Sequence, residues 1–194
     1  MKTIYYQFLV LFIAITTVIS CNAQTLPLNT KLKDITTNSY LKDLNNELDS
    51  YIGNYQGIFN GSTITLYITK EDHKYFNLDN LKFYQDVLIV RYVVRDSTGS
   101  ILQNTQNINF TTMKEKNLIH SLGTNPNLGM VVLSYNGTNC DIGWGNIYLK
   151  KLNNTQISWR YYAETVTTSS DRCSPSLDKI IYLPEGENLI FTKL

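Results

Sequence analysis

Apolar and polar residues alternate with a period of two over much of the chain after residue 53. In residues 63–70, threonine and tyrosine alternate with isoleucine and leucine, so that one face of the segment is polar and the other is apolar. Asn60-Gly61 stands directly before this segment, and this dipeptide is a strong signal for a tight turn. Residues 55–59 and 63–70 are therefore predicted to form a β-hairpin.

Further predicted strands follow at regular intervals, because segments rich in Ile, Val, Thr and Tyr are separated by turn signals such as Asn136-Gly137. They cover residues 83–94, a strand that opens at Ile101, and residues 117–122, 130–135, 145–152, 155–163, 178–183 and 188–193. No helical period alternates with them, which argues against a doubly wound α/β fold. About eight to ten strands predict a mainly β domain, an antiparallel meander that closes into a barrel or packs as a sandwich.

An apolar stripe with helical spacing precedes the first strand of this series. Its members are Leu41, Leu44, Leu48 and Ile52, at spacings of three, four and four residues. Asn38 or Ser39 can cap the start of a helix here, and Gly53 can end it. The stripe predicts one short N-terminal helix over roughly 40–51.

The first 20 residues have the pattern of a secretory signal. Lys2 supplies a positive charge, residues 4–19 are almost wholly apolar, and small residues follow. The alternative is a membrane-spanning helix, but the apolar run of about 16 residues is shorter than the roughly 20 that cross the hydrocarbon core. Residues 1–20 are therefore predicted to be an export signal that is removed from the mature protein.

Two routes of processing stay open. Val18-Ile19-Ser20-Cys21 resembles the bacterial lipobox, which implies that Cys21 is acylated and anchors the protein in the outer membrane. Residues 21–37 are then a polar tether, and residues 38–194 form a single domain. Cleavage after Ala23 would instead release a soluble secreted protein. Because no acidic residue follows directly after the lipobox cysteine, the periplasmic face is favoured over the cell surface.

Charge and composition exclude some classes of function. The 194 residues include 17 Lys and Arg against 16 Asp and Glu, and removal of the signal takes away Lys2 and no acid. Such a balanced chain lacks the basic clusters that a nucleic-acid binder needs. We find no motif of a phosphate-binding loop, a serine hydrolase or a zinc protease, and His73 and His120 stand alone. No catalytic residue, metal site or cofactor is predicted.

Export places the remaining cysteines, Cys140 and Cys173, where a disulfide can persist. A bond between them would close a loop of about 34 residues and stabilise the fold by ~4 kcal/mol. Two buried free thiols are the alternative. Either way, both cysteines lie in polar, loop-like sequence.

Aromatic residues are the candidates for binding. Trp144 lies between two glycines and can stand at the rim of a pocket, while Tyr55, Trp159 and Tyr161 lie in predicted strands. Aromatic rings on an exposed strand face would suit a glycan or a protein partner. The alternative is that these rings pack in the core, where strands often place them.

Several segments together resemble a family of small exported proteins of Bacteroidetes, especially flavobacteria, for which no activity is known. They include the lipobox, Phe83-Tyr84-Gln85-Asp86 and the stretch 137–145. The C-terminal two-cysteine pattern of that family maps onto Cys140 and Cys173.

A looser similarity is to lipocalin-like barrels, since Gly53-Asn54-Tyr55 holds the place of their opening Gly-x-Trp, with Tyr in place of Trp. That similarity implies a barrel that encloses a small apolar ligand. The leading expectation is thus a non-enzymatic envelope lipoprotein that binds such a ligand. The alternative is an interaction module for an envelope protein or a glycan.

Overall fold

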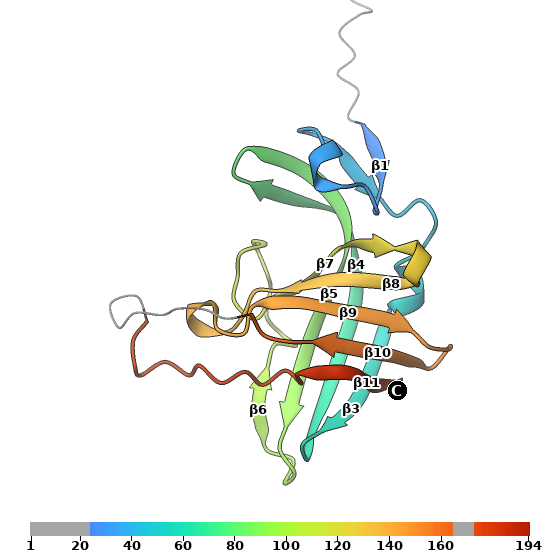
Figure 1. The fold of residues 1–194 in the computed structure, drawn as a ribbon. Helices are drawn as coiled ribbons and strands as arrows, with labels where there is room; N and C mark the ends of the chain where they lie inside the picture. Colours follow the sequence, from blue (N-terminus) through green and yellow to red (C-terminus); the bar gives the residue numbers. More distant parts are fainter. Residues whose placement is uncertain (1–23, 165–172) are drawn as a thin grey trace, which may run out of the picture.

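The computed structural model describes residues 24–164 and 173–194, most of which belong to one 11-stranded sheet (Figure 1). The strands are β1 (Thr25–Pro27), β2 (Tyr40–Lys42), β3 (Gly53–Phe59), β4 (Ser62–Leu78), β5 (Leu81–Arg95), β6 (Ile101–Asn104), β7 (Ile119–Asn125), β8 (Met130–Tyr135), β9 (Gly145–Lys151), β10 (Gln156–Tyr161) and β11 (Gly186–Lys193). Single 3-10 turns accompany them, namely η1 (Leu32–Asp34), η2 (Asp49–Tyr51), η3 (Pro126–Leu128) and η4 (Asn139–Asp141). The predicted export signal and Cys21 lie outside the described residues.

Eight of the strands close into an antiparallel barrel in the order of the sequence, from β3 to β5 and from β7 to β11. The ring closes where β5 pairs with β7 and where β11 pairs with β3 through Thr192↔Gln56 and Lys193↔Tyr55. β6 pairs antiparallel beside the C-terminal end of β5. Beside the N-terminal end of β5, β2 pairs in parallel, and β1 pairs in parallel with β2. The predicted antiparallel meander is confirmed as a barrel rather than a sandwich. Within the described ranges, no helix is long and apolar enough to span a membrane.

The first predicted hairpin is confirmed, with β3 and β4 joined by a two-residue turn. Phe59 faces Ser62 in the ladder, and Asn60 and Gly61 between them have φ angles of 48° and 78°. Positive φ at both positions is the conformation that matches the twist of the strands, and it is the reason why Asn-Gly favours this turn.

Large aromatic side chains fill the interior of the barrel. Six of them are less than 2 % exposed, namely Trp159, Tyr55, Tyr92, Tyr135, Tyr161 and Phe191. The ring of Trp159 lies 5.7 Å from that of Phe191 and 6.3 Å from that of Tyr161, and its indole N–H donates to the carbonyl oxygen of Pro184 at 2.9 Å. A closed eight-stranded barrel has just enough room for side chains of this size to fill it.

The N-terminal helix predicted over residues 40–51 is wrong. Tyr40–Lys42 is instead the short strand β2, and Leu44 is 55 % exposed, so the apolar stripe has no common face. The carboxylate of Asp43 accepts hydrogen bonds from the backbone N–H groups of Glu47 and Leu48 at 2.7 and 3.1 Å. An aspartate that bonds the backbone in this way competes with helix formation, and only the single turn η2 follows.

The strand predicted over residues 178–183 is also wrong, because this segment is a loop. The carboxylate of Asp178 accepts hydrogen bonds from the backbone N–H of Ile180 and from the hydroxyl of Tyr182. Ile180 is 58 % exposed and does not extend an apolar face. Local hydrogen bonds of an aspartate thus replace the ladder here as well.

Residues 24–37, which belong to the predicted tether, lie against the barrel and contain β1 and η1. Leu28 and Ile35 are buried in the main core cluster. Gly123 in β7 permits the close approach, since a Cβ atom there would stand 2.7 Å from the carbonyl oxygen of Leu28. A side chain at this position would therefore displace the N-terminal segment.

The buried carboxylate of Asp86 in β5 fixes the chain that follows, residues 40–43, and we call residues 24–43 together the N-terminal segment. This carboxylate accepts hydrogen bonds from the hydroxyl of Tyr40, from the backbone N–H of Asp43 at 2.9 Å and from that of His73 at 3.0 Å. Burial opposes its ionisation, but these hydrogen bonds more than offset burial and lower the pKa of Asp86 below its usual value. We call Asp86 and these three partners the carboxylate latch.

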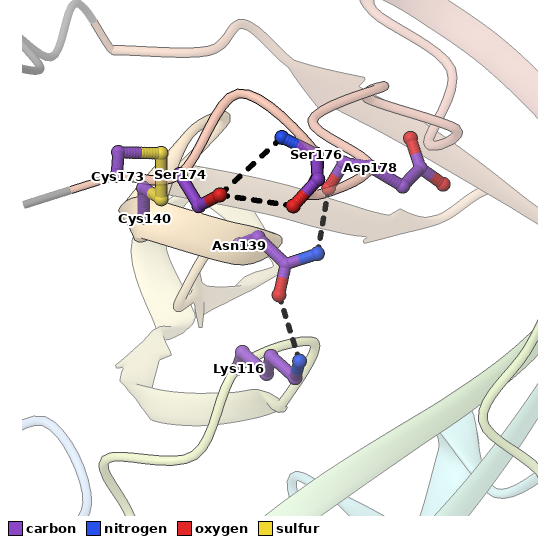
Figure 2. The surroundings of a disulfide bond; sticks show 7 residues. All are labelled: Lys116, Asn139, Cys140, Cys173, Ser174, Ser176 and Asp178. Carbon is purple, nitrogen blue, oxygen red and sulfur yellow. Dashed lines mark hydrogen bonds between the residues drawn. A yellow bond between two sulfur atoms is a disulfide. The ribbon is translucent and has the colours of Figure 1, made fainter. Parts of the chain in front are cut away.

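The structure brings Cys140 and Cys173 together as a disulfide-capable pair, with their Cα atoms 5.8 Å apart (Figure 2). Cys140 lies in η4, and Cys173 opens the loop that leads to β11. Beside them, the side chain of Asn139 donates to the carbonyl oxygen of Asp178 at 2.6 Å and accepts from Lys116 at 2.7 Å. The pair thus joins two loops that polar contacts also connect.

The latch predicts a large effect of Asp86→Asn on stability. An amide can accept only part of these hydrogen bonds, and it places an N–H group against other donors, so we expect the free energy of unfolding to fall by about 3 kcal/mol. Asp79→Asn is the matched control, because the Asp79 side chain is 92 % exposed, and it should change stability by less than about 0.5 kcal/mol. Urea unfolding of both variants measures the difference, and equal effects would contradict the latch.

Candidate functional site

A pocket of about 420 Å³ lies outside the barrel, between its wall and the N-terminal segment. The part of the β4–β5 hairpin that projects beyond the barrel, green in Figure 1, contributes Phe76, Leu78 and Phe83 to a further side. The pocket is lined by Thr30, Leu32, Ile35, Leu41, Phe76, Asn77, Leu78, Phe83, Gln85, Met113, Lys114, His120, Leu122, Ser134 and Asn136. We call it the outer pocket.

Strand alternation places the outer pocket on the outer face of β7 and β8. In β8 the fully buried Leu133 and Tyr135 point into the barrel, so Ser134 between them points outward. In β7 the same argument turns Ile119 inward and His120 outward, and Ser134 and His120 are paired neighbours in the ladder. The floor of the pocket is therefore the outer surface of the barrel at β7 and β8.

The apolar walls of the outer pocket come from segments far apart in the sequence. The stacked rings of Phe76 and Phe83, with centroids 5.1 Å apart, belong to the β4–β5 hairpin. Leu41 and Ile35 come from the N-terminal segment that the carboxylate latch holds. The pocket exists only while that segment stays docked, so the latch supports the site as well as the fold.

Two amide side chains at the pocket have their N–H groups committed to backbone carbonyls. The amide nitrogen of Gln85, a residue only 2 % exposed, donates to the carbonyl oxygens of Ser121 and Leu122 at 3.4 and 3.2 Å. That of Asn136 donates to the carbonyl oxygens of Met113 and Glu115 at 3.0 and 2.9 Å. Since carbonyl groups only accept, these contacts fix which end of each amide is the oxygen.

His120 is a buried imidazole at the same pocket. It is 5 % exposed, its ring lies 5.7 Å from that of Phe76, and its Nδ1 has no hydrogen-bond partner among the described residues. Burial disfavours the charged ring and lowers the pKa of His120 to about 4. The imidazole is therefore neutral at pH 7.

A second hollow of about 460 Å³ adjoins the outer pocket and contains Trp144. The two share Met113, Lys114, Ser134 and Asn136, so they form one continuous depression along β8. Of the aromatic residues considered for binding, Trp144 is 45 % exposed and lies at this rim. Tyr55, Trp159 and Tyr161 are fully buried, and none of them lines either hollow.

Comparison with known proteins finds a family model, described as a family of unknown function (DUF6705), that matches residues 1–194. The chain belongs to this family. No curated protein matches it, and no solved structure matches it. The outer pocket of this DUF6705 chain therefore has to be interpreted from its own chemistry.

In residues 24–164 and 173–194, no group of three or more His, Cys, Asp or Glu side chains is placed to hold a metal ion. The two histidines lie in different surroundings in this DUF6705 chain. His73 stacks on Tyr84 with ring centroids 4.0 Å apart and belongs to the latch, whereas His120 lines the outer pocket.

The pocket residues themselves were not predicted from the sequence. The one available signal for His120 was its position next to Ile119 in a predicted strand, which turns its side chain to the opposite face. Nothing along the chain shows that Leu32, Phe83 and His120 meet, because their contact depends on how separate segments dock.

Burial of neutral His120 predicts acid sensitivity. Its folded-state pKa of about 4 lies below the ordinary value of 6.5, so the unfolded chain binds the proton first as the pH falls. This contribution to stability is complete above about pH 6.5 and is lost towards pH 4, by at most about 3 kcal/mol. His120→Phe should remove this loss and leave stability at pH 7 unchanged or raised by about 1 kcal/mol, since no bonded partner is lost. Unfolding at pH 7 and pH 4.5 tests this, and an equal pH dependence in both proteins would refute it.

Proposed function

We propose that this chain is a non-enzymatic protein of the bacterial envelope that binds a small apolar ligand in the outer pocket. The observation that carries the proposal is the pocket itself. Its volume of about 420 Å³ lies in the range of pockets for small molecules, roughly 300–1,000 Å³, and aliphatic and aromatic side chains form most of its lining. A few polar groups converge on one wall, which is typical of sites that orient a ligand.

The proposed site differs from the one that a lipocalin-like barrel implies. There the ligand would enter the barrel, but here large rings such as Trp159 and Tyr92 occupy the interior. A ligand of the proposed kind is accommodated on the outer face, where Leu41 and Phe83 provide an apolar surface that the docked N-terminal segment shelters.

The position of the outer pocket supports an origin of the ligand in the membrane. We propose that residues 1–20 are an export signal and that acylated Cys21 anchors the chain in the outer membrane, facing the periplasm. Gln24 is the first described residue, three positions after Cys21, and three extended residues span about 10 Å. Thr30 and Leu32 of the pocket follow soon after. Such an anchor would keep the pocket close to the bilayer surface.

Trp144 supports a second candidate function. It is 45 % exposed and shares the adjoining hollow with the carboxylate of Asp141. An aromatic ring beside a carboxylate suits contact with a glycan or an envelope protein. This alternative would be favoured if Trp144→Ala lost binding of a glycan or an envelope protein while the outer pocket still bound its apolar ligand.

Binding of an apolar dye tests the main proposal. We expect N-phenyl-1-naphthylamine to bind the wild-type protein with increased fluorescence. Leu122→Glu should weaken that binding about tenfold or more, because it places a charge at the apolar lining. Leu152→Glu is the matched control, since Leu152 has the same 46 % exposure and does not line the pocket. No dye binding to the wild type, or equal loss in both variants, would refute the proposal.

The proposed anchor has its own test. In a bacterial host that processes lipoproteins, the wild-type chain should fractionate with membranes, and mass spectrometry should find an acylated N-terminus at Cys21. Cys21→Ala should appear in the soluble periplasmic fraction, because a domain without acyl chains has no such anchor. A wild-type N-terminus at Gln24 would instead establish cleavage after Ala23.

A further inference from the structure

We infer that the ligand of the outer pocket is an uncharged amphiphile whose polar end is a hydrogen-bond donor, a hydroxyl or an N–H group, held by the side-chain oxygen of Gln85. This inference rests on the proposed function and goes beyond it, because it names the chemical class of the ligand. It follows from which polar atoms at the pocket are already satisfied and which remain.

Gln85 provides the strongest argument. Both N–H groups of its amide face the carbonyl oxygens of Ser121 and Leu122. Its side-chain oxygen accepts no hydrogen bond from the described part of the chain, although the residue is only 2 % exposed and lines the pocket. Solvent can reach this oxygen through the pocket, and a ligand that covers it without supplying a donor would leave it unsatisfied, which is costly. A ligand that fills this space therefore gains most when it brings a donor to that oxygen.

Asn136 offers the same kind of group along the same wall. Its amide N–H groups are taken by the carbonyl oxygens of Met113 and Glu115, so its side-chain oxygen is the atom that remains to accept. Neutral His120 adds no positive charge to the lining. The lining thus presents two acceptor oxygens beside apolar side chains such as Phe83. The hydroxyl groups of Thr30 and Ser134 can accept as well as donate.

Charged head groups fit this wall poorly. A carboxylate would place its lone pairs against the oxygens of Gln85 and Asn136. An ammonium group would be buried without a counter-ion, since no Asp or Glu lines the outer pocket. Lys114 is the charged residue of the lining, but its side chain is 76 % exposed and lies 3.9 Å from the carboxylate of Asp79. A cation in that position contributes little to the selection of an anion.

Ligands with one tail and different heads test the inference. 1-Decanol, methyl decyl ether, decanoate and decyltrimethylammonium would each compete with N-phenyl-1-naphthylamine for the wild-type protein at pH 7. We expect the alcohol to bind about tenfold more tightly than the ether, which has no donor, and more tightly than either ion. Ether or decanoate binding as tightly as the alcohol would overturn the inference.

A variant links the preference to the residue. In Gln85→Met the alcohol should lose its advantage over the ether, to within about twofold, while the affinity for the ether stays the same. Gln103→Met is the control, because the Gln103 amide is also hydrogen-bonded, to Asn117, but lies outside the pocket. An alcohol preference that persists in a folded Gln85→Met protein would refute the role of Gln85. Should that variant fail to fold, the four-ligand comparison on the wild type still decides the ligand class.

The two proposals fail in different ways. If the dye binds and all four amphiphiles displace it equally, the outer pocket binds apolar molecules but the head-group inference is wrong. If neither the dye nor any amphiphile binds, the proposed function itself is wrong.

Discussion

The buried carboxylate of Asp86 is the contact on which both the fold of the N-terminal segment and the pocket depend. It accepts hydrogen bonds from the hydroxyl of Tyr40 and the backbone N–H groups of Asp43 and His73, which come from two distant parts of the chain, residues 40–43 and β4. The Lys70 ammonium adds to this region by bridging Asp43 and Asp49, at 2.9 and 2.7 Å. Without the latch, β1, η1 and β2 would be held by the short pairings of β1 and β2 and by the packing of Leu28 and Ile35 in the core.

The aromatic core explains why the site lies outside the barrel. A ring of eight strands encloses little volume, and residues such as Tyr92, Tyr135 and Trp159 use it. The long hairpin of β4 and β5 continues beyond the ring, and its apolar face would be exposed if nothing covered it. The N-terminal segment covers part of that face, and the space left between them is the outer pocket.

The sequence predicts the barrel strands and their first turn, because the signals for these elements lie in neighbouring residues. Strand alternation and the Asn60-Gly61 turn lead to the observed barrel strands because each depends on neighbouring residues. The helix at 40–51 could not be excluded from its leucine spacing, since the competing hydrogen bonds of Asp43 and the latch to Asp86 involve partners that the spacing does not show. The site could not be predicted for the same reason, because Gln85 and His120 acquire their surroundings only when distant segments dock.

The ring of strands closes between β11 and β3, and this pairing uses only the last residues of β11. It consists of Thr192↔Gln56 and Lys193↔Tyr55, and the backbone N–H of Leu194 adds a bond to the carbonyl oxygen of Asn54 at 2.9 Å. Every other junction between barrel strands except that of β5 with β7 is longer in register. Removal of these few residues by a carboxypeptidase would therefore convert a closed cylinder into an open sheet with two unprotected edges, although almost no core side chain would be lost.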